Sequence, residues 1–523
     1  MKSLFYSLIS LSLLMLLSPS KAEILMDPNE LSPVHWRSIQ KKIGDSFKQT
    51  YIKASDTSPE DSFGFSVALS GDTLVVGTIG SEAAYVFIYD KSRWVQQAYL
   101  QADNAIPDNA FGRLVAIDGD TIAIASVNHV YTFKRTGTTW TQQAHLPQKG
   151  FVFSIALNKE TLAVGMPFDF VDATPEILDD NVYFMGFVDV FKQNGDNWSK
   201  EFNLHVSGFE AFGSSVALEN NTLVVGAPGT SDDDNLTEET ISMMGYTGKA
   251  YIFERNNNDW QLLTTLTPSE NIQPFFGFKV ALSNNTIAVS GFSGFTLEKE
   301  QQEERVYLFS KTDDNWQQTA SLKASNSEVG DQFGSELALS NNTLIVGASN
   351  EDGQISQDNN EAQNSGAVYV FTQTKGTWSQ QAYIKAANVD AGDLFGHSLA
   401  LSGDLLVVGS PFEDGDFIGT GSTEGLNNNS LDSGSVLSME LDLSETHKTN
   451  IIFDWIERFF ALFFPNFMDT FSFDGYLVRG PYPRTGNYIG TKNGKVYVSG
   501  QQWGGLVEVG NIDDIYQRAL EQQ

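Results

Sequence analysis

The sequence of 523 residues contains no cysteine, so no disulfide can stabilise the protein and no lipid can be attached through an N-terminal cysteine. A protein of this size without disulfides depends on a large hydrophobic core. Basic residues are scarce, with 32 Lys and Arg against 65 Asp and Glu and a formal net charge of −33. Such a surface repels nucleic acid and anionic lipid, so we expect no nucleic-acid partner. It could attract cations or basic partners, or it could simply be solvated.

Long apolar runs are missing except at the N-terminus. Lys2 supplies a positive start, Leu4–Leu17 an apolar stretch, and Ser20-Lys21-Ala22 a small-x-small cleavage site. This run is shorter than the ~20 residues that span a bilayer, which favours a signal peptide (residues 1–22) over a membrane anchor. We therefore expect cleavage near Ala22 and a mature chain without a transmembrane segment that is secreted, periplasmic or at the cell surface.

Recognisable catalytic motifs are also missing. The chain has no Cys nucleophile, none of its six His falls in a His-Glu-x-x-His spacing, and no Gly-x-Ser-x-Gly elbow is present. The Gly-rich stretch Gly415–Gly421 lacks the Lys-Ser/Thr of a phosphate-binding loop. The sequence therefore predicts a protein that is not an enzyme, with no catalytic residue and no cofactor.

Two fixed intervals recur along the chain. A Phe, usually followed by Gly, stands fourteen residues before the end of an apolar strand seven times: Phe63, Phe111, Phe151, Phe212, Phe276, Phe333 and Phe395. The last Phe of a "VYVF"-like strand is followed seven residues later by Trp six times: Trp94, Trp140, Trp198, Trp260, Trp316 and Trp378. Intervals without insertions indicate a repeated structural unit. We expect the Trp side chains to pack between units, with a sugar-binding set as the alternative.

Each repeat contains four short runs with strand character and tight-turn residues between them, as in Phe63–Ala102. A four-stranded antiparallel unit repeated seven times is typical of a β-propeller. Phe47–Ala54 matches a fourth strand such as Gln380–Ala386, whereas the seventh repeat lacks its own fourth strand. We therefore predict an all-β, seven-bladed propeller over residues 47–443 that is closed by the N-terminal strand.

The stretches Phe212–Gly229 and Phe333–Ser349 resemble FG-GAP repeats, the blades of the propeller in integrin α subunits and in many exported bacterial proteins. The resemblance covers roughly Phe47 to Leu443 and is strongest to the bacterial form. It implies adhesion or protein–protein interaction. The third and fifth copies depart from the pattern, because Val152 replaces the Gly after Phe151 and Ser290-Gly291 replaces the final Gly.

In the integrin form of the family, calcium loops lie between the first and second strands, but this chain has only a short turn there, such as Ser70-Gly71-Asp72. The loops between the second and third strands are acidic instead, and carboxylates in turns can bind Ca²⁺. The candidate ligands are Asp232, Asp234, Glu351, Asp352, Glu413, Asp414 and Asp416. Plain solvation of these side chains is the alternative.

In an antiparallel blade, the second-to-third loops share one face with the links between blades. Loop length varies on this face, and variable loops on a rigid scaffold commonly carry binding sites. Candidate partner-binding aromatics in these loops are Phe168, Phe170, Tyr183, Phe184, Phe292 and Phe295, which could instead fold inward. We expect a monomer that binds a protein or cell-surface ligand here. The alternative is an enzyme or saccharide-binding protein with a site at the propeller channel or in the C-terminal unit.

From residue 449 to 523 the pattern changes. Ile452, Trp455, Phe459 and Phe463 follow helical spacing, and Pro465 ends the run. Residues 488–491 and 495–498 flank Asn493-Gly494, which predicts a hairpin, and residues 512–522 predict a short helix. We therefore expect a small C-terminal α+β unit.

Overall fold

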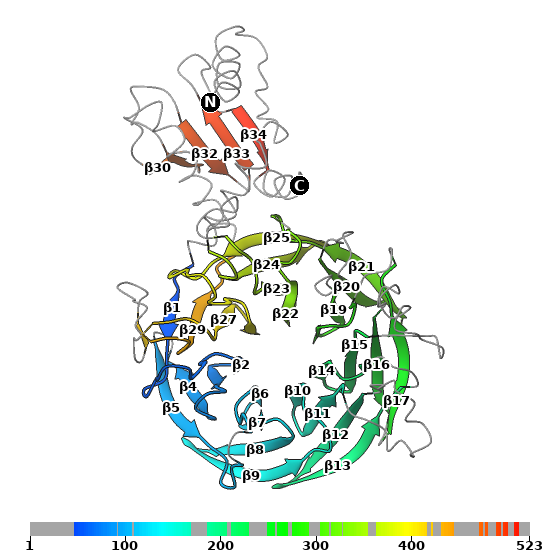
Figure 1. The fold of residues 1–523 in the computed structure, drawn as a ribbon. Coiled ribbons are helices and arrows are strands. Elements are labelled where there is room, and N and C mark those ends of the chain that lie inside the picture. Colours follow the sequence, from blue (N-terminus) through cyan, green and yellow to red (C-terminus); the bar gives the residue numbers. More distant parts are fainter. Residues whose placement is uncertain are drawn as a thin grey trace. The chain divides into compact units, whose positions relative to one another are not determined.

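The structure is a computed structural model that describes residues 47–443 with internal gaps and five strands between residues 470 and 511 (Figure 1). The gaps within 47–443 are residues 91–92, 107–108, 169–185, 207–210, 230–247, 257–258, 270–274, 292–303, 313–314, 327, 354–361, 416–419 and 422–429. The chain divides into a unit at Phe47–Leu441 and a unit that holds Met1–Ser46 and Asp442–Gln523. Every regular element of the described residues is a strand.

Seven antiparallel sheets, called blades 1 to 7, surround a common axis in the first unit (Figure 1). Blade 1 has β2 (Ser66–Ser70), β3 (Thr73–Gly77), β4 (Ala84–Tyr89) and β5 (Trp94–Leu100). Blade 2 has β6 (Leu114–Asp118), β7 (Thr121–Ala125), β8 (His129–Thr136) and β9 (Thr139–Pro147). Blade 3 has β10 (Ser154–Asn158), β11 (Thr161–Met166), β12 (Phe187–Asn194) and β13 (Asn197–Leu204). The seven-bladed, all-β architecture is confirmed.

The other blades repeat this order. Blade 4 has β14 (Ser215–Glu219), β15 (Thr222–Ala227), β16 (Lys249–Asn256) and β17 (Asp259–Leu266). Blade 5 has β18 (Val280–Ser283), β19 (Thr286–Gly291), β20 (Arg305–Thr312) and β21 (Asn315–Leu322). Blade 6 has β22 (Phe333–Ser340), β23 (Thr343–Ala348), β24 (Ala367–Thr374) and β25 (Thr377–Ile384).

Blade 7 takes strands from both ends of the first unit. It contains β26 (Ser398–Ser402), β27 (Leu405–Ser410) and β29 (Ser435–Glu440), together with β1 (Thr50–Ile52) and β28 (Thr420–Gly421). Strand β1 pairs antiparallel with β29, with Tyr51 opposite Leu437. It therefore occupies the position that the fourth strand has in the other blades.

The seven-residue interval is a property of the hairpin between the third and fourth strands. In blade 1, Tyr89 is paired with Trp94, and the register shifts by one residue between Val86 and Phe87. The same shift recurs at the corresponding place in blades 2 to 6. Because the hairpin and its bulge are constant, the interval allows no insertion.

The blade Trp residues pack between neighbouring blades, as expected. Trp94 is buried in a cluster with Val407 and Val436 of blade 7, and its ring nitrogen donates to the Ser438 hydroxyl at 2.7 Å. Trp140 of blade 2 donates to Gln97 of blade 1 at 2.9 Å. These two rings are buried between blades and therefore do not form a sugar-binding platform.

The Phe-Gly step of each repeat builds the contact between one blade and the next. A Cβ on Gly77, at the end of β3, would lie 1.8 Å from the carbonyl oxygen of Gly112 in blade 2. Gly112 itself has a φ of 100°, which side chains rarely tolerate. The fourteen-residue interval from Phe63 thus ends at a glycine, Gly77, that lets the backbones of neighbouring blades touch.

The Phe that begins each fourteen-residue interval packs in the blade core in six blades, where its side chain is at most 4 % exposed. In blade 1 the Phe63 ring meets Tyr85 and Phe87 edge-on, with centroids 5.6 and 6.1 Å apart. Equivalent pairs recur in blades 2, 4, 5 and 6. Edge-to-face contacts of this kind add specificity to the burial of the ring.

Blade 3 breaks this rule, and the sequence interval was wrong there. Phe151 is 37 % exposed, while Val152 is fully buried. The Val152 N–H donates to the Val127 carbonyl at 2.8 Å, as Phe395 does to Ser365 at 3.0 Å. Val152 therefore replaces the core Phe, not the Gly that follows it, and Phe151 is displaced to the surface.

The second unit contains one described sheet of five antiparallel strands in sequential order: β30 (Thr470–Phe473), β31 (Tyr476–Arg479), β32 (Tyr488–Lys492), β33 (Lys495–Ser499) and β34 (Val507–Asn511). Strands β32 and β33 pair with Lys492 opposite Lys495, which confirms the predicted hairpin. The helices predicted at 452–463 and 512–522 lie outside the described residues. In the described part of the chain, no helix is long and apolar enough to cross a membrane.

Candidate functional site

The two faces of the propeller differ in how regularly their turns and loops are hydrogen-bonded to neighbouring blades. On the face of the first-to-second turns, side chains of one blade bind the turn of the next. Ser70 accepts from the Gly119 N–H at 3.1 Å, and Ser283 accepts from the Asn341 N–H at 3.0 Å. Asn341 has a φ of 53°, the left-handed conformation these two-residue turns require. This face is a constant ring of short, mutually bonded turns.

The opposite face carries the second-to-third loops and the links between blades. Asn326, in the link from blade 5 to blade 6, donates to Glu351 in the second-to-third loop of blade 6 at 3.1 Å, so loop and link meet. Of the sequence candidates, the structure places Phe168, Glu351, Asp352, Glu413 and Asp414. The others lie outside the described residues: Asp232, Asp234, Asp416, Phe170, Tyr183, Phe184, Phe292 and Phe295.

Glu351 is almost completely buried and fully engaged by the protein. One carboxylate oxygen accepts hydrogen bonds from Tyr383 at 2.8 Å and Asn326 at 3.1 Å. The other accepts from the Lys385 ammonium at 2.6 Å and the Gly353 N–H at 3.0 Å. Burial lowers the pKa of Lys385, and the carboxylate opposes that shift. A buried pair of this kind persists because hydrogen bonds satisfy both groups.

Glu413 repeats this arrangement in blade 7. Its carboxylate accepts from the Lys53 ammonium at 3.1 Å, from Asn388 at 2.9 Å and from the Tyr51 hydroxyl. Lys53 also donates to the Ser433 hydroxyl. Tyr51 and Lys53 come from the N-terminal segment, so the cluster of blade 7 is assembled from both ends of the first unit.

The neighbouring aspartates hold backbone turns. Asp352 accepts from the Asn364 N–H and Asp414 from the Asp432 N–H, each at 2.8 Å. No group of three His, Asp or Glu side chains suited to a metal ion occurs among the described residues. The described acidic candidates therefore act in this structure as the internal framework of the loops.

The links before blades 6 and 7 and the second-to-third loop of blade 5 contain buried acids that were missed in the sequence. Asp331 and Asp393 are the second residue before the Phe-Gly step, and each accepts from the N–H three residues earlier at 3.0 Å. Burial raises the pKa of Asp331 to about 7 and that of Asp393 to about 8, against the pull of those bonds. Glu304 accepts from the Phe333 N–H at 2.6 Å, and burial raises its pKa to about 7. The repeated Gly-Asp-x-Phe-Gly spelling in blades 6 and 7 was the available signal.

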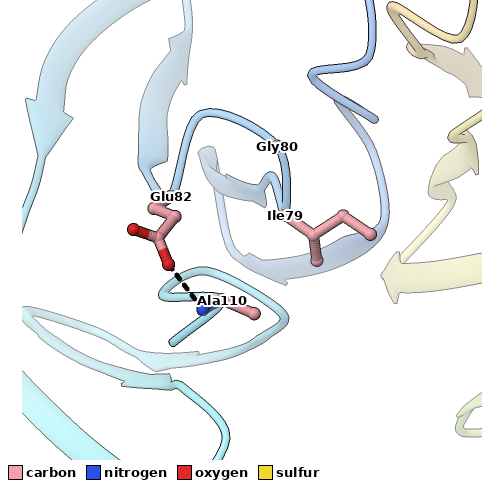
Figure 2. A pocket seen from close by; sticks show the side chains of 4 residues that line it. All are labelled: Ile79, Gly80, Glu82 and Ala110. Carbon is pink, nitrogen blue, oxygen red and sulfur yellow. Dashed lines mark hydrogen bonds between the residues drawn. The ribbon is translucent and has the colours of Figure 1, made fainter. Parts of the chain in front are cut away.

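A small cavity of about 240 Å³ lies beside blade 1 on the face of the second-to-third loops, lined by Ile79, Gly80, Glu82 and Ala110 (Figure 2). One oxygen of the Glu82 carboxylate accepts from the N–H groups of Asn109 and Ala110, both at 2.6 Å. Among the described residues that line the cavity, only Glu82 has a titratable side chain. Its bonds anchor the link to blade 2, which is a structural use of the carboxylate.

An aromatic patch with one guanidinium lies on the face of the second-to-third loops, where the chain enters the first strands of blades 2 and 3 and leaves β11. Phe151 and Phe168 are 37 % and 41 % exposed, and Phe153 lies between them with centroids 6.2 and 5.4 Å away. The Arg113 guanidinium lies 4.4 Å from the Phe151 ring centroid and donates to the Val152 carbonyl. We call these four side chains the blade-3 patch. Phe168 was a sequence candidate. The other three were missed because they lie just before β6 and β10, outside the second-to-third loops in which candidates were sought.

The FG-GAP repeat family model matches residues 47–87, 206–253, 316–371 and 378–436, which fall mainly on blades 1, 4, 6 and 7. The chain therefore contains FG-GAP repeats in these four regions. FG-GAP propellers commonly serve in protein interaction, and the matches leave out blades 2 and 3, which carry the blade-3 patch, and most of blade 5. No curated protein matches the sequence.

Among solved structures, the chain is similar to Saccharomyces cerevisiae Sqt1, with 11 % identity and a TM-score of 0.42 over 75 % of this chain and 97 % of that one. This likeness is too remote to indicate a shared function.

Proposed function

We propose that this FG-GAP protein is an exported, non-enzymatic β-propeller that binds a protein or cell-surface ligand through the face of the second-to-third loops. In this proposal the signal peptide is residues 1–22, and strand β1 closes the ring of a monomer. Adhesion or assembly at the outside of a cell is the role that suits such a module.

The contrast between the two faces carries the proposal. First-to-second turns have nearly constant length and are bonded to each other, as Ser283 is to Asn341. Second-to-third connections range from Ala125–His129 in blade 2 to Ala227–Lys249 in blade 4 and Ser410–Ser435 in blade 7. Length variation on a rigid scaffold is typical of binding loops. Exposed rings at the base of this face, Phe151 and Phe168, are the kind of side chain that anchors protein partners.

Loop replacement tests the proposal. We expect a variant in which short Gly-Ser links replace residues 230–247 and 422–429 to fold normally, because Glu413 and its buried partners are retained. The same variant should lose the partners that the wild-type protein captures from its native surroundings, as identified by mass spectrometry.

The matched control lies on the other face. Asn284→Gly introduces the residue that Gly71, Gly119 and Gly403 already supply at the equivalent turns, each in the left-handed conformation. It should leave capture unchanged. Capture that survives the loop replacement, or that is lost equally in the control, would contradict a binding site on the loop face.

A further inference from the structure

Blade 3 leaves an aromatic ring outside its core, and the reason lies in the residues around it. In five blades the buried Phe packs edge-on against a third-strand Tyr such as Tyr251. The equivalent residue in blade 3 is Asp189, a buried carboxylate bound by Lys200 at 3.0 Å and Asn203 at 2.7 Å. A Phe ring would meet a carboxylate there, where blade 7 has Leu437 and the other blades have Tyr, and Val152 fills the core in its place. Burying a Phe is worth about 1.5–3 kcal/mol, so exposing Phe151 forgoes stabilisation that the other blades have.

Arg113 differs from the other arginines that lie over aromatic rings. Arg135 lies over Trp140 and pairs with Asp120 at 2.7 Å. Arg255 lies over Trp260 and pairs with Glu201 at 2.9 Å. Arg113 has its ring, Phe151, and one backbone carbonyl, but in the described part of the chain it forms no ion pair.

The environment of Arg113 disfavours an uncompensated charge. The side chain is half-buried, and burial lowers the pKa of its guanidinium. A carboxylate supplied from outside would restore the balance, because a guanidinium binds carboxylates through two parallel hydrogen bonds. The neighbouring rings exclude water from that pair and strengthen it.

We propose that the blade-3 patch is a receptor for a segment of a protein partner in which a carboxylate lies next to a bulky apolar side chain. Arg113 binds the carboxylate, and Phe151, Phe153 and Phe168 pack against the apolar group. The local charge favours this occupant, because Arg113 forms no ion pair among the described residues and a single carboxylate is enough to balance it. The inference rests on the proposed function and names the chemistry of its partner.

The ring geometry disfavours a saccharide. A sugar stacks on the flat face of an aromatic ring, but a face of Phe151 is covered by the Arg113 guanidinium. Phe153 and Phe168 meet at 88°, edge to face, so they do not form a common flat platform. Such a corner suits an aliphatic or aromatic side chain that inserts between rings.

A peptide array tests the proposal with the full chain. Each acetylated peptide pairs one Asp with one Phe, Trp or Leu, and a matched peptide has Asn in place of Asp. We expect the Asp peptides to be retained about 10-fold more strongly than their Asn counterparts, the effect of a charged hydrogen-bonded pair. Arg113→Gln should remove this preference. Arg255→Gln, which alters an arginine stacked on Trp260 elsewhere, should keep it.

A second variant guards against misfolding. Phe168→Ala removes an exposed ring and should reduce retention several-fold while the melting temperature stays at the wild-type value. Equal retention of Asp and Asn peptides, or an unchanged preference in Arg113→Gln, would overturn the proposal. So would binding of glucuronate oligosaccharides in place of peptides. If the array fails while the loop replacement still abolishes partner capture, only the chemistry of the partner is wrong and the proposed function stands.

Discussion

Blades 6 and 3 are built from the same repeat but use its side chains differently. In blade 6, Phe333 is fully buried and Glu351 is neutralised by Lys385 inside the loop. In blade 3, Phe151 is outside the core, and Arg113 of blade 2, which lies over its ring, has no carboxylate partner among the described residues. In the regular blade the aromatic rings are buried and the charged groups are paired with each other, so both stabilise the fold. The irregular blade leaves them exposed, which is why we place the binding chemistry there.

The largest effect is expected from breaking the buried ion pairs of the regular blades. Lys385→Met leaves Glu351 buried without its cation, and Lys53→Met does the same to Glu413. Each should lower the free energy of unfolding by about 3–5 kcal/mol, measured by urea denaturation. Similar losses would show that the N-terminal segment is as firmly integrated as a strand within the ring.

A double variant separates charge from packing. Glu351→Leu combined with Lys385→Met removes both charges, and much of the loss should be recovered because the uncompensated charge is gone. Additive losses would mean that the pair acts only through packing.

Deleting the core ring of the regular blade should cost nearly as much. Phe333 is fully buried and contacts Tyr369 and Phe371 edge-on. Phe333→Ala should therefore destabilise the propeller by about 3–5 kcal/mol, measured by the same denaturation. A change below about 1 kcal/mol would show that the interval Phe is not a core residue even in the regular blades.

The buried acids of the links predict a smaller, pH-dependent effect. Burial raises the pKa of Asp331 to about 7 in the folded protein, against about 4 in an unfolded chain. Between these values the folded state holds a proton that the unfolded state has lost, so the stability contributed by this group falls as pH rises from 4 to 7. Asp331→Asn should thus gain stability relative to wild type, on the order of 2 kcal/mol, across that range. A pH-independent difference in melting temperature would contradict the shift.

The sequence was sufficient for the blade count because the fixed intervals measure hairpins and blade contacts, which tolerate no insertion. It misassigned Phe151 because an interval counts residues without showing which of two neighbours enters the core. The substitution of Asp189 for the third-strand Tyr was the available clue. In the C-terminal unit the hairpin signal at Asn493-Gly494 was correct. The comparable signal Asp474-Gly475, between β30 and β31, was missed.

The candidate site was harder to predict. Glu351 and Glu413 look like solvated loop acids or metal ligands in the sequence, because their lysines come from fourth strands far along the chain. Blades 6 and 7 share two sequence features, a Glu-Asp-Gly loop and a Tyr-Ile-Lys-Ala segment at the fourth strand. Only the register of the strands brings the two segments together. Arg113 was missed for the same reason, because the aromatic ring over which its guanidinium lies, Phe151, belongs to the next blade.

The central claim is that blade 3 keeps Phe151 outside the core for binding, and Phe151→Ala tests it most directly. The measurement is the free energy of unfolding of this variant, compared with Phe333→Ala under the same conditions. We expect a change within about 1 kcal/mol of wild type, the size typical of surface positions, although partner capture is lost. A loss of about 3–5 kcal/mol, equal to that of Phe333→Ala, would show that the ring belongs to the core and would contradict the account.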